Sequence, residues 1–151
     1  MRDKLRALLG LTRAEWGVLV QAWVLLLWVD LGLRLLPFPR LRAWAAPGEL
    51  AHSRKIPDGE ALAQIQGIQS LVNSAARNHL YPMTCLRRSL VLQRMLGRRS
   101  IPAELRLGVR KEEGQLKAHA WLEYQGQPVG EAEDLEEKYW GLVGVEEHFS
   151  L

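Results

Sequence analysis

The sequence has few residues that could form a covalent cross-link or hold a metal ion. Its 151 residues include one cysteine, three methionines and four histidines. A single cysteine excludes an intramolecular disulfide and every zinc or iron–sulfur site that needs several thiolates. We therefore expect no metal site, and a lone thiol is typical of a reducing, cytoplasmic compartment. Hydrophobic residues make up 48% and charged residues 25%, which indicates a folded globular chain.

Positive and negative charges are divided unevenly along the chain. Residues 1–110 hold 17 Lys and Arg against 7 acidic residues, whereas residues 111–151 hold 3 against 10. The arginines are spread over several expected elements, and no basic patch with interleaved aromatic residues is present. We therefore expect the two ends of one domain to attract each other, and we expect no nucleic-acid partner.

The chain also lacks a long uncharged run. In the apolar N-terminal third, the longest uncharged run, residues 16–29, has 14 residues and is bracketed by Glu15 and Asp30, whereas a membrane-spanning helix usually needs about 20 apolar residues. Residues 12–15 (TRAE) form a capping-box motif, which predicts a helix over residues 13–36. Three interpretations remain open for its Trp and Leu side chains: packing on their own domain, docking of a partner protein, or membrane-peripheral contact. Core packing is favoured over membrane contact.

The next part of the chain reads as a connector and two further helices. Residues 37–56 are rich in Pro and Arg and predict an irregular connector. We divide the chain into an N-terminal helix with its connector, residues 1–50, and a core domain, residues 51–151. Asp58 is the expected N-cap of a second helix that ends before Tyr81.

A third helix, ending near Gly97, is predicted after Thr84 as its N-cap. Cys85 then falls in the first turn, where free main-chain N–H groups and the helix dipole favour a negative charge. This position favours a nucleophilic thiolate. The alternative is a small buried core residue, the commonest place for a free cysteine.

After the third helix the hydrophobic period changes to two. It predicts strands over residues 105–110 and 116–124, then a short strand over 128–131. If residues 124–126 form a three-residue loop, Glu123 pairs with Gln127, and His119 lies opposite Glu131. A carboxylate there would accept a hydrogen bond from the imidazole and orient it.

The chain order is thus a thiol on a helix start, a histidine on a strand and a carboxylate on the next strand, as in the papain–transglutaminase arrangement. The segments that carry a closer likeness are residues 85–90 (CLRRSL), 101–103 (IPA), 108–110 (GVR) and 118–121 (AHAW). Across about residues 82–131, the sequence resembles the transglutaminase-like cysteine peptidases of lasso-peptide maturation.

That resemblance implies an α+β, transglutaminase/papain-like fold, with N-terminal helices followed by a small antiparallel sheet. It implies a peptidase that removes the leader from a ribosomally synthesised precursor peptide through a thioester, without a cofactor. Cys85 would be the nucleophile, His119 the base and Glu131 the acidic residue, where the family often has Asp; Glu133 and Asp134 are nearby substitutes. The implied partners are the precursor, a separate leader-recognition protein and a cyclase of the same pathway.

Four more residues are weaker candidates for substrate or oxyanion contacts. Asn78 or His79, which precede the thiol helix, could donate to an oxyanion, together with the Cys85 N–H. Arg88 lies one turn after the thiol, and Trp121 shares the strand face of His119. Two other functions remain open: another acyl transferase on the same triad, and a non-catalytic peptide-binding module of the same fold.

Overall fold

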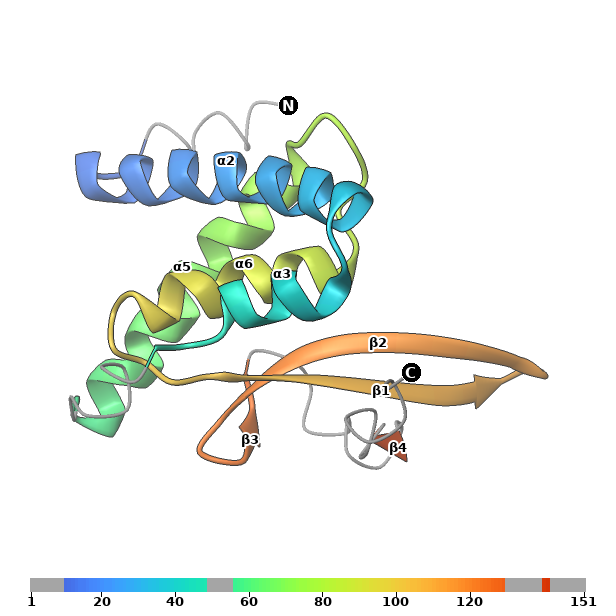
Figure 1. The fold of residues 1–151 in the computed structure, drawn as a ribbon. Coiled ribbons are helices and arrows are strands. Elements are labelled where there is room, and N and C mark those ends of the chain that lie inside the picture. Colours follow the sequence, from blue (N-terminus) through green and yellow to red (C-terminus); the bar gives the residue numbers. More distant parts are fainter. Residues whose placement is uncertain (1–9, 49–55, 130–139, 142–151) are drawn as a thin grey trace.

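The computed structural model describes residues 10–48, 56–129 and 140–141. In these ranges four helices precede four strands: α2 (Arg13–Leu35), α3 (Phe38–Ala45), α5 (Asp58–Arg77), α6 (Cys85–Gly97), β1 (Glu104–Glu112), β2 (Gln115–Tyr124), β3 (Gln127–Pro128) and β4 (Trp140–Gly141). The helices lie together above the sheet (Figure 1). All strand pairs are antiparallel, in the order β3-β2-β1-β4. The expected α+β class, with helices first and a small antiparallel sheet after them, is confirmed.

α2 begins with the capping box that the sequence predicts. The Thr12 hydroxyl accepts a hydrogen bond from the Glu15 main-chain N–H at 3.3 Å, and the Glu15 carboxylate accepts one from the Thr12 N–H at 2.7 Å. These bonds satisfy N–H groups that a helix start otherwise leaves unpaired. The helix ends at Leu35, one residue before the expected end.

One face of α2 packs on the other helices. Its buried residues are Ala22, Leu26, Val29, Asp30 and Gly32. Asp30 joins two helices, since its carboxylate pairs with Arg87 of α6 at 2.8 Å and with Arg34 of α2 at 3.1 Å. The opposite face of α2 is exposed.

The expectation of an irregular connector over residues 37–56 is wrong for its first part, because α3 covers Phe38–Ala45. Proline is tolerated in the first helical turn, where the N–H groups have no helical partner, so Pro39 does not break this helix. Leu41 is buried against Gly32 of α2, where an added Cβ would lie 3.0 Å from Leu41 Cδ1. Burial of this face stabilises a helix that the local pattern does not predict.

The starts of α5 and α6 lie close to their expected positions. Pro57, not Asp58, is the N-cap of α5, and Asp58 is its first helical residue. The Asp58 carboxylate instead accepts a hydrogen bond from Gln125 Nε2 at 2.8 Å, which joins the start of α5 to the β2–β3 turn. Thr84 is the N-cap of α6 as expected, but its side chain makes no capping hydrogen bond. The main chain alone therefore forms this helix start.

The first hairpin joins the two strands that the alternation predicts, and both strands run further toward the turn than the expected ends at residues 110 and 116. Glu112 pairs with Gln115, and the two residues between them, Glu113 and Gly114, have φ of 50° and 81°. Positive φ at both central residues is the requirement of a type I′ turn, which suits the twist of the flanking strands.

The second hairpin differs from the predicted register by one residue. Tyr124 pairs with Gln127 and Glu123 with Pro128, so the loop has two residues, Gln125-Gly126, instead of three. Both loop residues have positive φ, 52° and 77°. The predicted pairing of Glu123 with Gln127 is therefore wrong, because Gln125 takes a left-handed conformation that we expected of the glycine alone.

α6 lies at the centre of the fold and contacts α2, α3, α5 and the strands β1 and β2. On β2, Ala120, Leu122 and Tyr124 belong to the core that the helices cover. Trp121 points to the other face of the strand and is also buried, with 5% of its surface exposed. The half of β2 that follows His119 is therefore covered on both faces.

Candidate active site

Cys85 is the first residue of α6 and is half-buried. The N–H groups of a first helical turn have no partner within the helix, and the helix dipole gives this end a partial positive charge. The sequence-based prediction for the local setting of Cys85 thus agrees with the fold.

A cavity of about 70 Å³ lies beside Cys85. It is lined by Gln69, Val72 and Asn73 of α5, by Cys85, Arg88, Ser89 and Leu92 of α6, and by Ala120, Trp121, Leu122 and Val129 of the sheet. This volume is comparable to about two water molecules.

His119 is connected to this cavity through Trp121. The two residues alternate onto the same face of β2, and their rings are stacked, with centroids 6.0 Å apart and an angle of 17° between the planes. Trp121 lines the cavity beside Cys85, whereas His119, half-buried, does not line it. Trp121 is therefore the residue that both lines the cavity beside Cys85 and stacks its ring on the imidazole.

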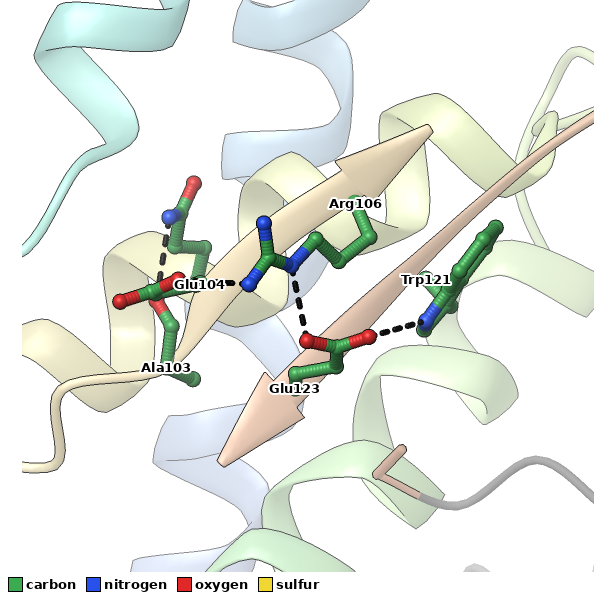
Figure 2. A network of polar contacts seen from close by, with 6 residues as sticks. Ala103, Glu104, Arg106, Trp121 and Glu123 are labelled. Carbon is green, nitrogen blue, oxygen red and sulfur yellow. Dashed lines mark hydrogen bonds and ion pairs between the residues drawn. The ribbon is translucent and has the colours of Figure 1, made fainter. Parts of the chain in front are cut away.

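Trp121 belongs to a chain of polar contacts on this face of the sheet (Figure 2). Its Nε1 donates to Glu123 Oε1 at 3.3 Å, Arg106 Nε donates to Glu123 Oε2 at 2.7 Å, and Arg106 Nη2 pairs with Glu104 at 3.3 Å. The hydrogen bond and the charge of Glu123 raise the pKa of Arg106 above its ordinary value. This permanently charged group fixes Glu123, and Glu123 in turn orients the indole.

Two residues with side-chain amides, Gln69 and Asn73 of α5, line the cavity beside Cys85, and the sequence interpretation missed both. Asn73 lines the cavity, and its Oδ1 accepts a hydrogen bond from Arg88 Nη1 at 3.4 Å. Because the oxygen bonds to Arg88, the Nδ2 donors point away from that guanidinium. Arg88 and Trp121, two of the weaker candidates, line the same cavity.

Asn78 does not line this cavity, so the expectation that it donates there is wrong. It is the exposed C-cap of α5, and its Nδ2 donates to the Ser74 carbonyl at 2.8 Å. The spacing from the cysteine suggested Asn78, but the crossing of α5 and α6 brings Asn73 there instead. No local pattern in the sequence indicates that crossing.

The expected acidic residue, Glu131, lies outside the described residues, as do Glu133 and Asp134. The register that set Glu131 opposite His119 differs by one residue from the observed ladder, so that geometric argument no longer supports the pairing. Within the described ranges, no group of three or more His, Cys, Asp or Glu residues could hold a metal ion.

Comparison with known families agrees with this arrangement. The family model described as the transglutaminase-like superfamily matches residues 25–143, a range that includes α5, α6, the sheet, Cys85 and His119. No curated protein and no solved structure matches the chain significantly. The family match covers well over half of the sequence, and the chain therefore belongs to the transglutaminase-like superfamily.

Proposed function

We propose that this chain is a cysteine peptidase that removes the leader from a ribosomally synthesised precursor peptide, in the maturation of a lasso peptide or a related product. One observation carries the proposal: Cys85 at a helix start and Trp121 line one cavity, and Trp121 stacks on His119. Membership of the superfamily supports thiol-dependent acyl chemistry in general. The likeness of the segments around Cys85 and His119 to leader peptidases supports the narrower activity.

In the first step, His119 takes the proton from Cys85 Sγ, and the thiolate attacks the carbonyl carbon of the scissile peptide bond. Negative charge then develops on the carbonyl oxygen. The Cys85 main-chain N–H and Asn73 Nδ2 would donate hydrogen bonds to that oxygen. Asn73 suits this task because its Oδ1 already accepts a hydrogen bond from Arg88. The Asn73 N–H groups therefore point away from Arg88.

In the second step, His119 gives its proton to the leaving amine, the C–N bond breaks, and the leader remains as a thioester on Cys85. A water molecule, deprotonated by His119, then attacks the thioester. The leader leaves with a carboxylate end, and the thiol is regenerated. Glu131 would hold the imidazole and stabilise its charged form, a role that we propose from the sequence alone.

The polar face of α5 would bind the peptide near the scissile bond. A hollow of about 270 Å³ is lined by Gln66, Gln69, Ser70, Asn73 and Arg77. Gln69 and Asn73 also line the cavity beside Cys85, so the two spaces adjoin. Amide side chains here can bond the main chain of an extended peptide, and Arg77 would favour an acidic residue. A separate recognition protein would present the leader, and a cyclase would use the new amine.

Cleavage of the precursor tests the proposal directly. The full chain is incubated with its cognate precursor and recognition protein, and the products are identified by mass spectrometry. We expect a hydrolysed leader from wild type and none from Cys85→Ala or His119→Ala. His79→Ala is the control, because that ring packs on Trp23, 4.7 Å away between centroids. An intact precursor with folded wild-type protein would overturn the proposal.

Alkylation of the single cysteine separates the two alternative functions. Its rate with iodoacetamide is measured against pH, in wild type and His119→Ala, with the partners bound. A His119-dependent rate together with an amine-modified product would identify an acyl transferase. A slow thiol without His119 dependence, with peptide binding retained in Cys85→Ala, would identify a binding module instead.

A further inference from the structure

A row of large apolar side chains lies exposed along α2. It consists of Trp16, Val20, Val24, Leu27, Trp28, Leu31 and Leu35, which are 39% to 71% exposed. We call this row the α2 stripe. At 1.5 Å per residue it is about 28 Å long. Single exposed apolar residues are ordinary on a protein surface, but a continuous row of this length marks an interaction site.

Positively charged side chains border the α2 stripe at both ends. At 3.6 residues per turn, Arg13 and Leu31 are about five turns apart, and so are Trp16 and Arg34. Both arginines therefore continue the line of the stripe. Arg13 is exposed, and the Arg34 side chain is 61% exposed although it also pairs with Asp30 at 3.1 Å. An apolar row between cationic ends complements an anionic lipid surface, where apolar groups enter the acyl region and arginines meet phosphates.

Both acidic residues of α2 lie away from the stripe. Glu15 is engaged in the capping box, and Asp30 is buried, with 5% of its surface exposed. α2 is long and apolar enough to cross a bilayer, and 33% of its most apolar window is buried in the fold. Crossing would break the Asp30–Arg87 pair and expose Asp30 to hydrocarbon, which is costly. The fold therefore favours a helix that lies on the bilayer over one that spans it.

We propose that the α2 stripe docks this protein on the surface of an anionic lipid bilayer, with α2 lying in the plane of the interface. Trp16 and Trp28 suit this position, because tryptophan prefers the boundary between headgroups and acyl chains. The cavity beside Cys85 lies between α5, α6 and the sheet, so docking through α2 leaves it uncovered. The inference is independent of the proposed peptidase function.

Vesicle flotation of the full chain tests the docking surface. The vesicles are phosphatidylcholine alone, or phosphatidylcholine mixed with phosphatidylglycerol. We expect binding to the anionic vesicles, weakened by added salt. Leu31→Glu should reduce the partition coefficient at least about tenfold, because it places a carboxylate in the apolar row. Leu62→Glu on α5 is the matched control, since Leu62 is 48% exposed and Leu31 is 46% exposed.

The outcomes are distinct. Binding that Leu31→Glu loses and Leu62→Glu keeps supports the proposal, provided that circular dichroism shows both variants folded. No binding by the wild type overturns it, as does equal loss in the two variants. A third outcome is that the wild type binds no vesicles but forms a dimer, or a complex with the recognition protein, and that Leu31→Glu abolishes this association. That outcome overturns the proposal in favour of a protein partner. The peptidase function is measured separately, as cleavage of precursor free in solution by the Leu31→Glu variant. Its failure would therefore be distinguishable from a failure of vesicle binding.

Discussion

Ser89 of α6 donates a hydrogen bond from its Oγ to the main-chain carbonyl of Ala120 on β2, over 3.2 Å. Both residues are buried. Ser89 lies about one turn after Cys85, and Ala120 directly follows His119 along the strand. This bond therefore holds the first turns of the thiol helix against the strand that carries the imidazole.

Ser89→Ala should weaken both the fold and the site. The variant leaves a buried carbonyl without its donor, which costs about 1–3 kcal/mol of unfolding free energy. Urea unfolding measures this cost, and precursor cleavage measures the displacement of the thiol from the imidazole. Ser74→Ala is the control, because the Ser74 hydroxyl accepts an exposed hydrogen bond from Arg77 on its own helix. Stability and cleavage equal to wild type in Ser89→Ala would contradict this role.

Asn73→Ala should lower kcat for precursor cleavage by about 10²–10³-fold, the usual loss for one oxyanion donor. The alkylation rate of Cys85 should remain unchanged, because alkylation develops no carbonyl oxyanion. Asn78→Ala removes the same side chain from the solvent-exposed end of the same helix, and we expect cleavage close to wild type. Equal losses in the two variants would show that Asn73 has no special role.

Replacement of Trp121 should lower the stability of the protein and change the environment of the His119 ring. Trp121→Ala removes a buried ring, at a cost of about 3–5 kcal/mol. Trp121→Phe keeps a ring but loses the hydrogen bond to Glu123, at about 1 kcal/mol. The NMR shifts of the His119 ring protons should move strongly in the Ala variant and less in the Phe variant. Unchanged His119 shifts in both would refute the stacking.

Asp30→Asn should strongly destabilise the protein. The Asp30 carboxylate is buried and pairs with Arg87, so its neutralisation leaves a poorly compensated cation between α2 and α6. Breaking one partner of such a pair costs about 3–5 kcal/mol. Urea unfolding measures the effect, with exposed Glu60→Gln on α5 as the control. A cost no larger than in Glu60→Gln would mean that the pair does not hold α2 in place.

We expect the free energy of unfolding to depend on pH through the Glu15 carboxyl. Hydrogen bonds from the Thr12 main-chain N–H and then from its hydroxyl lower the pKa of the Glu15 carboxyl. Because the folded pKa lies below the unfolded one, this stabilisation is complete above the ordinary carboxyl pKa of about 4.3 and is lost as pH falls through the folded pKa.

Glu15→Ala should therefore destabilise the protein at neutral pH, and its difference from wild type should shrink in acid. Urea midpoints at a series of pH values measure this difference. A difference that stays constant across the carboxyl range would show that the charge of Glu15 contributes nothing to the cap.

Most of the elements were predictable because local physics specifies them. The capping box at Thr12 starts α2, and the alternation after Gly97 predicts the two strands β1 and β2. α3 was not predictable, because it depends on burial of Leu41 against another helix. The β2–β3 register was also missed, because Gln125 adopts a left-handed backbone conformation that its residue type does not predict.

Local sequence signals were enough to predict the elements on which the two candidate catalytic residues lie: Cys85 at a helix start and His119 on a strand. These are local properties of capping, periodicity and turns. Packing between elements far apart in the chain sets Asn73, instead of Asn78, in the lining of the cavity beside Cys85, and it sets which face of α2 stays exposed. The reason is physical: both depend on how α5 and α6 cross and on the buried Asp30–Arg87 pair, contacts between residues far apart in the chain.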